Sequence, residues 1–179
     1  MEIGAAVRKL NGLRVVGWRA WTVVETPRGL RLGSVIYDEV WRPGATAIAA
    51  CRRDEDPFAE AVGPHRVPGA ECSCGFHAAH DPVDALSYLR GRDEPGTVTR
   101  VLGEVALSGE IVETEAGWRA SSAYPVRLYV AEAAVADALS VYGVPVLSPG
   151  CALVSSLTCT ATPSPSARRW RTSIATASI

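Results

Sequence analysis

Residues 72–80, Cys-Ser-Cys-Gly-Phe-His-Ala-Ala-His, concentrate side chains that bind metals or react as nucleophiles. The chain has 5 cysteines and 3 histidines, and this segment holds two of each. Cys51 and His65 lie a short way upstream. Thiolate and imidazole together are the ligands that Zn²⁺ takes in tetrahedral protein sites. The segment is therefore a candidate zinc site.

The spacing of these residues suggests which of them would act as ligands. On an extended backbone Cys72 and Cys74 project from the same face, and Gly75 lets the chain curl after them because it has no Cβ. The curl would bring His77 round as a third ligand. Cys51 then completes the predicted set of Cys51, Cys72, Cys74 and His77, and His65 or His80 remain alternatives for the last position. The pattern lacks a C-x₂-C pair, so buried thiols near a helix N-terminus remain the competing interpretation.

The same residues allow a thiol enzyme as a second hypothesis. Cys74 would be the nucleophile and His77 its base, with the start of the following helix lowering the thiol pKa. Such catalysis also needs an orienting group and an oxyanion site, and the sequence identifies neither. Phosphate-binding, dinucleotide-binding and common hydrolase motifs do not occur in the chain. We therefore expect a non-enzymatic protein.

Tryptophan is followed directly by arginine at four of the 5 tryptophans, and one such pair is repeated in its context. Residues 17–20 and 117–120 both read Gly-Trp-Arg-Ala. In a strand, neighbouring side chains point to opposite faces, so the simplest expectation is a buried Trp and a solvated Arg. If exposed instead, Trp18, Arg19, Trp118 and Arg119 could bind an anionic ligand or stack nucleic-acid bases. A small-barrel nucleic-acid-binding protein is thus a third hypothesis.

Composition narrows the class of protein. The chain has 179 residues, 47% of them hydrophobic, and a net charge of −1. The near-neutral charge disfavours a protein that mainly coats nucleic acid or an anionic membrane. No apolar run reaches the ~20 residues of a membrane-spanning helix, and residues 1–4 do not resemble a secretion leader. We expect a cytoplasmic location, where cysteines stay reduced.

Hydrophobic periodicity predicts an α+β fold that is rich in β-structure. Alternating and β-branched residues predict strands at 13–25, 30–37, 98–113 and 118–130. Gly103 and Gly109 inside the third strand indicate bulges or tight coiling. Helices are expected near 82–90, where Asp81 and Pro82 form a start signal, and at 131–142. We therefore predict a coiled sheet or small barrel of antiparallel hairpins on which two helices pack.

The chain divides by composition near residue 150. Residues 1–150 predict a single globular domain that contains the Cys/His cluster. Residues 151–179 are rich in Ser, Thr, Ala and Pro and predict a flexible tail, because such a composition cannot pack a core.

Three segments carry a resemblance to a known family. They are 72–78 (CSCGFHA), 103–113 (GEVALSGEIVE) and 117–125 (GWRASSAYP). Within about residues 15–147 the chain resembles a family of small uncharacterised bacterial proteins, mainly actinobacterial. No activity is assigned to that family, so the resemblance implies none. In similar sequences the position of His77 can be Tyr, which implies that Cys51, Cys72 and Cys74 carry more of the ligation.

The leading hypothesis is a non-enzymatic cytosolic module. Its cysteine cluster would bind a structural zinc ion, and a face of its sheet would recognise a protein partner or a small ligand.

Overall fold

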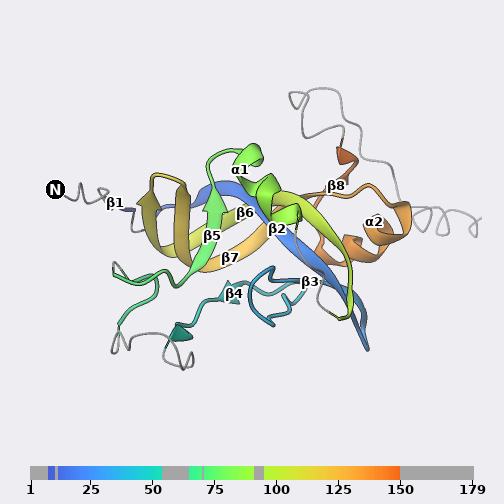
Figure 1. Ribbon diagram of the computed structural model, residues 1–179, viewed down its shortest axis with the longest axis horizontal. Helices are drawn as coiled ribbons and strands as arrows, with labels where there is room; N and C mark the ends of the chain where they lie inside the picture. Colours follow the sequence, from blue (N-terminus) through green and yellow to red (C-terminus); the bar gives the residue numbers. More distant parts are fainter. Residues whose placement is uncertain (1–7, 11, 54–64, 70, 91–94, 150–179) are drawn as a thin grey trace, which may run out of the picture.

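The computed structural model describes residues 8–10, 12–53, 65–69, 71–90 and 95–149 (Figure 1). The strands are β1 (Arg8–Lys9), β2 (Val15–Thr26), β3 (Gly29–Gly33), β4 (Ala47–Ile48), β5 (Phe76–Ala79), β6 (Thr97–Thr114), β7 (Gly117–Tyr129) and β8 (Val146–Leu147). The helices are α1 (Pro82–Leu86) and α2 (Ala133–Leu139), followed by the 3₁₀ turns η2 (Ser87–Leu89) and η3 (Ser140–Tyr142).

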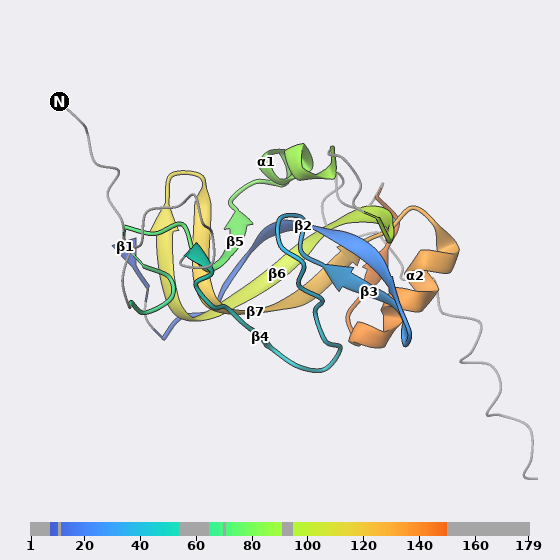
Figure 2. The same ribbon diagram turned by 60° about the horizontal axis from the view of Figure 1, so that its bottom comes forward.

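Four of the strands close into a ring. β2 pairs with β6, β6 with β7, β7 with β5 and β5 again with β2, all antiparallel. Figures 1 and 2 show the long strands β6 and β7 curving across the molecule, with β5 beside them. The remaining strands extend this ring: β1 pairs with β6, β3 with β2, and β4 and β8 with β7. The predicted α+β fold, a β-rich coiled sheet or small barrel with two helices, is confirmed.

Glycines make the closure and the curvature of the ring sterically feasible. A Cβ on Gly17 in β2 would lie 2.9 Å from the Cβ of Ala78 and 2.9 Å from the carbonyl oxygen of Ala79, both in β5. The backbones of β2 and β5 therefore approach as closely as only glycine permits. In β6, the register shifts around Gly109, which has φ 79°. This is the bulge that the sequence predicted at that glycine.

The four predicted strands correspond to β2, β3, β6 and β7 with ends that differ by one or two residues, except at the end of β3, and the short strands β1, β4, β5 and β8 were not predicted. The expected strand at 30–37 stops at Gly33, and a turn replaces its second half. There the hydroxyl of Ser34 accepts hydrogen bonds from the backbone N–H groups of Ile36 and Tyr37, at 3.4 Å each. Serine competes in this way with strand pairing by bonding to nearby backbone.

Aromatic side chains fill the interior between the ring and the loop that follows β3. Trp41 lies edge-on to Trp21, with ring centroids 5.5 Å apart, and edge-on to Phe76 at 5.1 Å. All three are less than 5% exposed. Because Phe76 begins β5, this packing anchors the strand that directly follows the cysteines.

Local signals mark the start of α1 and the end of the 3₁₀ turn after α2. The Asp81 side chain accepts from the N–H of Val83 at 2.7 Å and caps α1, with Pro82 at its first position. Gly143 ends the turn after α2 with φ 68°. The α-helical parts are shorter than the predicted 82–90 and 131–142, since the last turn of each is 3₁₀. α1 contacts β2, and α2 contacts β3.

Two further predictions are a flexible C-terminal tail and the absence of a membrane-spanning helix. The predicted tail at 151–179 lies outside the described residues. Across the part of the chain that the structure describes, no helix combines the length and apolarity needed to cross a bilayer.

Candidate metal centre

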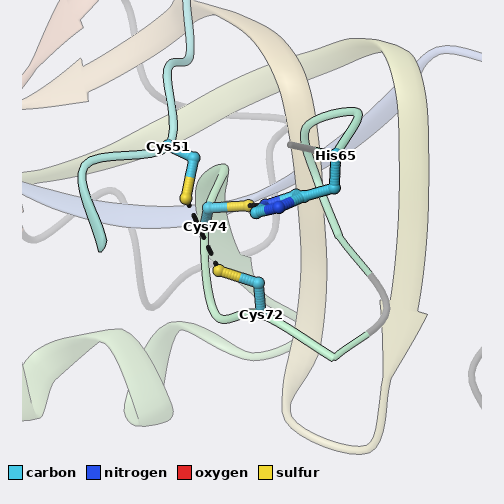
Figure 3. A group of neighbouring side chains, drawn as sticks. All are labelled: Cys51, His65, Cys72 and Cys74. Atoms are coloured by element: carbon cyan, nitrogen blue, oxygen red, sulfur yellow. Dashed lines mark hydrogen bonds between the residues drawn. The ribbon is translucent and has the colours of Figure 1, made fainter. Parts of the chain in front are cut away.

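Three cysteines and one histidine meet beside the start of β5. They are Cys51, from the segment after β4, and His65, Cys72 and Cys74, from the segment before β5 (Figure 3). One ligand atom of each, Sγ or an imidazole nitrogen, lies within 4.8 Å of all the others. Cys51 Sγ and Cys72 Sγ are 3.7 Å apart, and His65 Nε2 is 3.3 Å from Cys74 Sγ. Cys51, which lies 14 or more residues from each of the others in sequence, thus joins them in one group of soft donors.

These distances match those of a tetrahedral zinc site. Two sulfurs bound to one Zn²⁺ at ~2.3 Å with a tetrahedral angle are about 3.8 Å apart, and a sulfur and an imidazole nitrogen are about 3.5 Å apart. The 3.7 Å and 3.3 Å separations fall on two opposite edges of such a tetrahedron. The donors could therefore hold a tetrahedral ion after only small movements.

Two glycines give the cysteine segment its tight path. A Cβ on Gly69 would lie 2.6 Å from the His65 ring and 3.1 Å from the Cβ of Cys72. The Gly69 N–H also donates to Cys74 Sγ at 3.3 Å, the kind of bond that orients a thiolate ligand. Gly75 has φ 109°, as expected for the residue at which the chain curls toward β5.

The buried side chain of Arg119, in β7, donates hydrogen bonds to the backbone of the cysteine segment. Its Nη1 donates to the carbonyl oxygens of Gly69 at 3.3 Å, of Cys74 at 3.2 Å and of Cys72. The side chain is 8% exposed. Through these contacts of one buried nitrogen with three carbonyls, Arg119 holds the shape of the loop that carries two of the thiols.

The thiols differ in how readily they ionise. Burial raises the pKa of Cys74 to about 11, and the neighbouring Cys72 adds to the rise because two adjacent thiolates repel. Burial also opposes ionisation of Cys72, but hydrogen bonds, first from the Cys74 backbone N–H and then from the side chains of Cys74, Cys51 and Arg53, outweigh it and lower that pKa to about 7. A divalent cation among the sulfurs would remove the repulsion and favour all the thiolates.

His77 is the one residue of the predicted ligand set that lies outside the group. Its Nε2 is 2.7 Å from the carbonyl oxygen of Ser73, and its ring is exposed. His65 takes the fourth place instead. His80 is also elsewhere, with Nε2 3.2 Å from the carbonyl oxygen of Thr114. The two-residue alternation of β5 explains why His77 lies apart from the group: Phe76 and Ala78 point into the core, so His77 points outward.

The thiol-enzyme hypothesis required Cys74 to lie against His77. Instead the Cys74 sulfur lies against His65 and the Gly69 N–H. A thiol pKa of about 11 leaves little nucleophilic thiolate at neutral pH. The arrangement around Cys74 is that of a ligand sulfur more than that of an activated nucleophile.

The two Trp-Arg pairs are placed differently from the expectation of buried Trp and solvated Arg. Trp18 and Trp118 are half-buried at the surface of the ring, where Trp18 stacks on Tyr129 at 5.6 Å and Trp118 lies edge-on to His80 at 4.0 Å. Both arginines instead turn toward the backbone. Besides Arg119, Arg19 donates through Nη1 to the carbonyl oxygen of His77 at 2.7 Å.

The Arg19 guanidinium lies among aromatic rings. Its carbon is 5.3 Å from the centroid of Trp41, 5.9 Å from Phe76 and 6.0 Å from Trp21. Burial lowers the pKa of Arg19 to about 10, although the carboxylate of Glu39 partly offsets this. The half-buried Arg19 side chain therefore packs against the aromatic rings that anchor β5, which the sequence did not indicate.

A hollow of about 600 Å³ adjoins the cysteine group. Its walls include Arg53, Glu71, Cys72, Ser73, His77 and Arg119. Of the candidate ligand-binding residues, Arg119 lines this hollow, while Trp18, Arg19 and Trp118 do not. The hollow places charged and polar groups beside Cys72.

The chain matches no protein-family model, and the comparisons with curated proteins and with solved structures give no match either.

Proposed function

We propose that Cys51, His65, Cys72 and Cys74 bind one zinc ion. The observation that carries the proposal is the convergence of three sulfurs and one imidazole nitrogen within 4.8 Å. Three thiolates and one imidazole form one of the standard structural zinc ligand sets. Softer donors of this kind favour Zn²⁺ over Mg²⁺ or Ca²⁺, which prefer oxygen ligands.

The charge balance of the surroundings supports the same ion. Three thiolates and one Zn²⁺ carry a net charge of −1. The buried guanidinium of Arg119, which donates to the loop carrying Cys72 and Cys74, supplies one positive charge nearby. Burying an anionic zinc centre next to a buried cation costs less free energy than burying either charge alone.

The proposed role of the zinc is structural. All four positions of a tetrahedral ion are taken by protein side chains, whereas catalytic zinc keeps one position for water or substrate. The ion would tie the segment after β4, through Cys51, to the segment before β5. β4 and β5 both pair with β7, so the zinc would fasten two connections on the same side of the ring.

The protein as a whole would then be a non-enzymatic module that recognises a protein partner or a small ligand. The hollow beside the zinc, with Arg53 and Arg119 in its wall, is the surface we assign to that recognition. The site also suits a reducing compartment such as the cytosol, because the ligand thiols must stay unoxidised.

Metal content tests the zinc proposal. The protein is purified without chelators, and zinc is measured by elemental analysis. We expect about one zinc per chain, as four-coordinate structural sites hold one ion. Cys51→Ser and His65→Asn should lose most of it, and the matched control His77→Asn should keep it. A zinc-free parent protein that also fails to take up added zinc would refute the proposal. So would equal losses in the two histidine variants.

A further inference from the structure

The three sulfurs of the cluster are not equivalent in their contacts. Cys51 Sγ and Cys72 Sγ face each other at 3.7 Å, as the dashed line between them shows (Figure 3). Cys74 Sγ is instead directed to the His65 ring and the Gly69 N–H, each at 3.3 Å. A disulfide needs its sulfurs ~2.05 Å apart, so the Cys51 and Cys72 sulfurs would have to approach by less than 2 Å.

Cys72 is also the sulfur-bearing residue that lines the hollow. Its side chain is 4% exposed, so large reagents are excluded, but the hollow of about 600 Å³ admits a small molecule to its edge. Arg53 and Arg119 stand in the same wall. Peroxides oxidise cysteine through its thiolate form.

We propose that Cys51 and Cys72 form a site of oxidation by hydroperoxides, and that their disulfide expels the zinc. The proposal rests on the zinc site described above and adds its regulation. Cys72 reacts first because it is the member of the pair that lines the hollow, and Cys51 resolves the product because its sulfur faces that of Cys72 at 3.7 Å. Cys74 and His65 remain as two ligands, too few to retain the ion.

The chemistry balances with hydrogen peroxide as the oxidant. The Cys72 thiolate attacks one peroxide oxygen, the O–O bond breaks, and the departing hydroxide takes a proton to become water. This leaves a sulfenic acid on Cys72. The Cys51 thiolate then attacks the Cys72 sulfur, the S–S bond forms, and the second hydroxide leaves and takes a proton. Two thiolates lose two electrons in total, and one peroxide with two protons becomes two waters.

The test uses the full chain loaded with zinc, in which Cys151→Ser and Cys159→Ser remove the cysteines outside the cluster. Hydrogen peroxide is titrated in, released zinc is measured with a chromogenic chelator, and tryptic peptides are mapped by mass spectrometry without reduction. We expect one zinc released for each disulfide formed, with Cys51 linked to Cys72. Cys72 and Cys74 share one tryptic peptide, so fragmentation of the linked pair assigns the bond. A thiol reductant with added zinc should restore the loaded protein.

A second variant tests the order of the two steps. In Cys51→Ser the sulfenic acid on Cys72 loses its partner, and a cyclic 1,3-diketone should label Cys72 several-fold more than in the parent. The proposal is overturned if the disulfide joins Cys72 to Cys74 or links two chains. It is also overturned if zinc leaves without a disulfide, or if the trapped sulfenic acid is on Cys74. If the parent never binds zinc, the zinc proposal fails separately, and peroxide treatment of the metal-free protein still shows whether Cys51 and Cys72 pair.

Discussion

Arg19 and Arg119 donate hydrogen bonds to the same stretch of backbone, the one that carries Cys72 and Cys74 and leads into β5, from the two strands on either side of β5. Arg119 donates to carbonyl oxygens at the start of the segment, those of Gly69, Cys72 and Cys74, and Arg19 donates to that of His77 at its end. Each arginine belongs to one copy of the Gly-Trp-Arg-Ala motif. The two motifs occupy β2 and β7, the strands that flank β5. In both copies of the tetrapeptide, the arginine thus hydrogen-bonds to backbone carbonyls and positions the segment that carries the cysteines.

Replacing Arg119 should weaken metal binding without removing any ligand. In Arg119→Lys, the ammonium lies one bond nearer to the backbone than Nη1 and cannot reach all three carbonyls, so the loop that presents Cys72 and Cys74 loosens. We expect zinc affinity to fall about 10–100-fold, the usual effect of losing a group that supports the ligands. Competition with a chelator of known affinity measures the change. Arg14→Lys, at an exposed position, is the control, and equal affinity in all three proteins would contradict the assignment.

Gly69→Ala should disrupt the same site by steric conflict. The added methyl group would meet the His65 ring at 2.6 Å and the Cβ of Cys72 at 3.1 Å. One or both ligands must then move, so the zinc content should drop well below that of the parent. Elemental analysis is the readout. Ser73→Ala alters an exposed side chain in the same loop and should leave the zinc content unchanged.

Removing the zinc should lower the thermal stability, because the ion binds the folded chain and joins two of its segments. With free zinc at 100 times its dissociation constant, the stabilisation is about 2.7 kcal/mol, which corresponds to roughly 5–10 °C in Tm for a domain of this size. Thermal unfolding with and without a chelator measures it. His65→Asn should show almost no response to the chelator, and a response as large as that of the parent would show that the chelator acts elsewhere.

Tyr142 should be the most sensitive tyrosine for stability. Its hydroxyl accepts from the N–H of Leu32 at 2.9 Å and donates to the carbonyl oxygen of Trp41 at 2.7 Å, and the side chain is buried. Tyr142→Phe leaves two buried backbone groups unpaired, which should cost about 1–3 kcal/mol. Denaturant unfolding gives the value. Tyr37→Phe, at a residue 55% exposed, should change stability by less than about 0.5 kcal/mol.

Local patterns in the sequence were enough to predict the strands β2, β3, β6 and β7 and both helices, but not the short strands β1, β4, β5 and β8. The alternation along residues 98–113 and the β-branched run at 13–25 give β6 and β2, since the period of side chains in a strand is a local property. The Asp81-Pro82 pair marks the start of α1 for the same reason, because a helix cap involves only its immediate neighbours. The cysteine segment could likewise be identified as a candidate metal site from residue types alone.

Only the tertiary structure decided which residues complete that site and what the arginines do. His65 and His77 are equally suitable ligands by type, and His77 is the nearer of the two to Cys72 and Cys74 along the chain. The choice between them depends on how the loop at 65–75 folds back, with Gly69 allowing the His65 ring to come close. The burial of Arg119 similarly depends on the pairing of β5 with β7. Contacts between distant parts of a chain follow from closure of the whole ring, which no local pattern encodes.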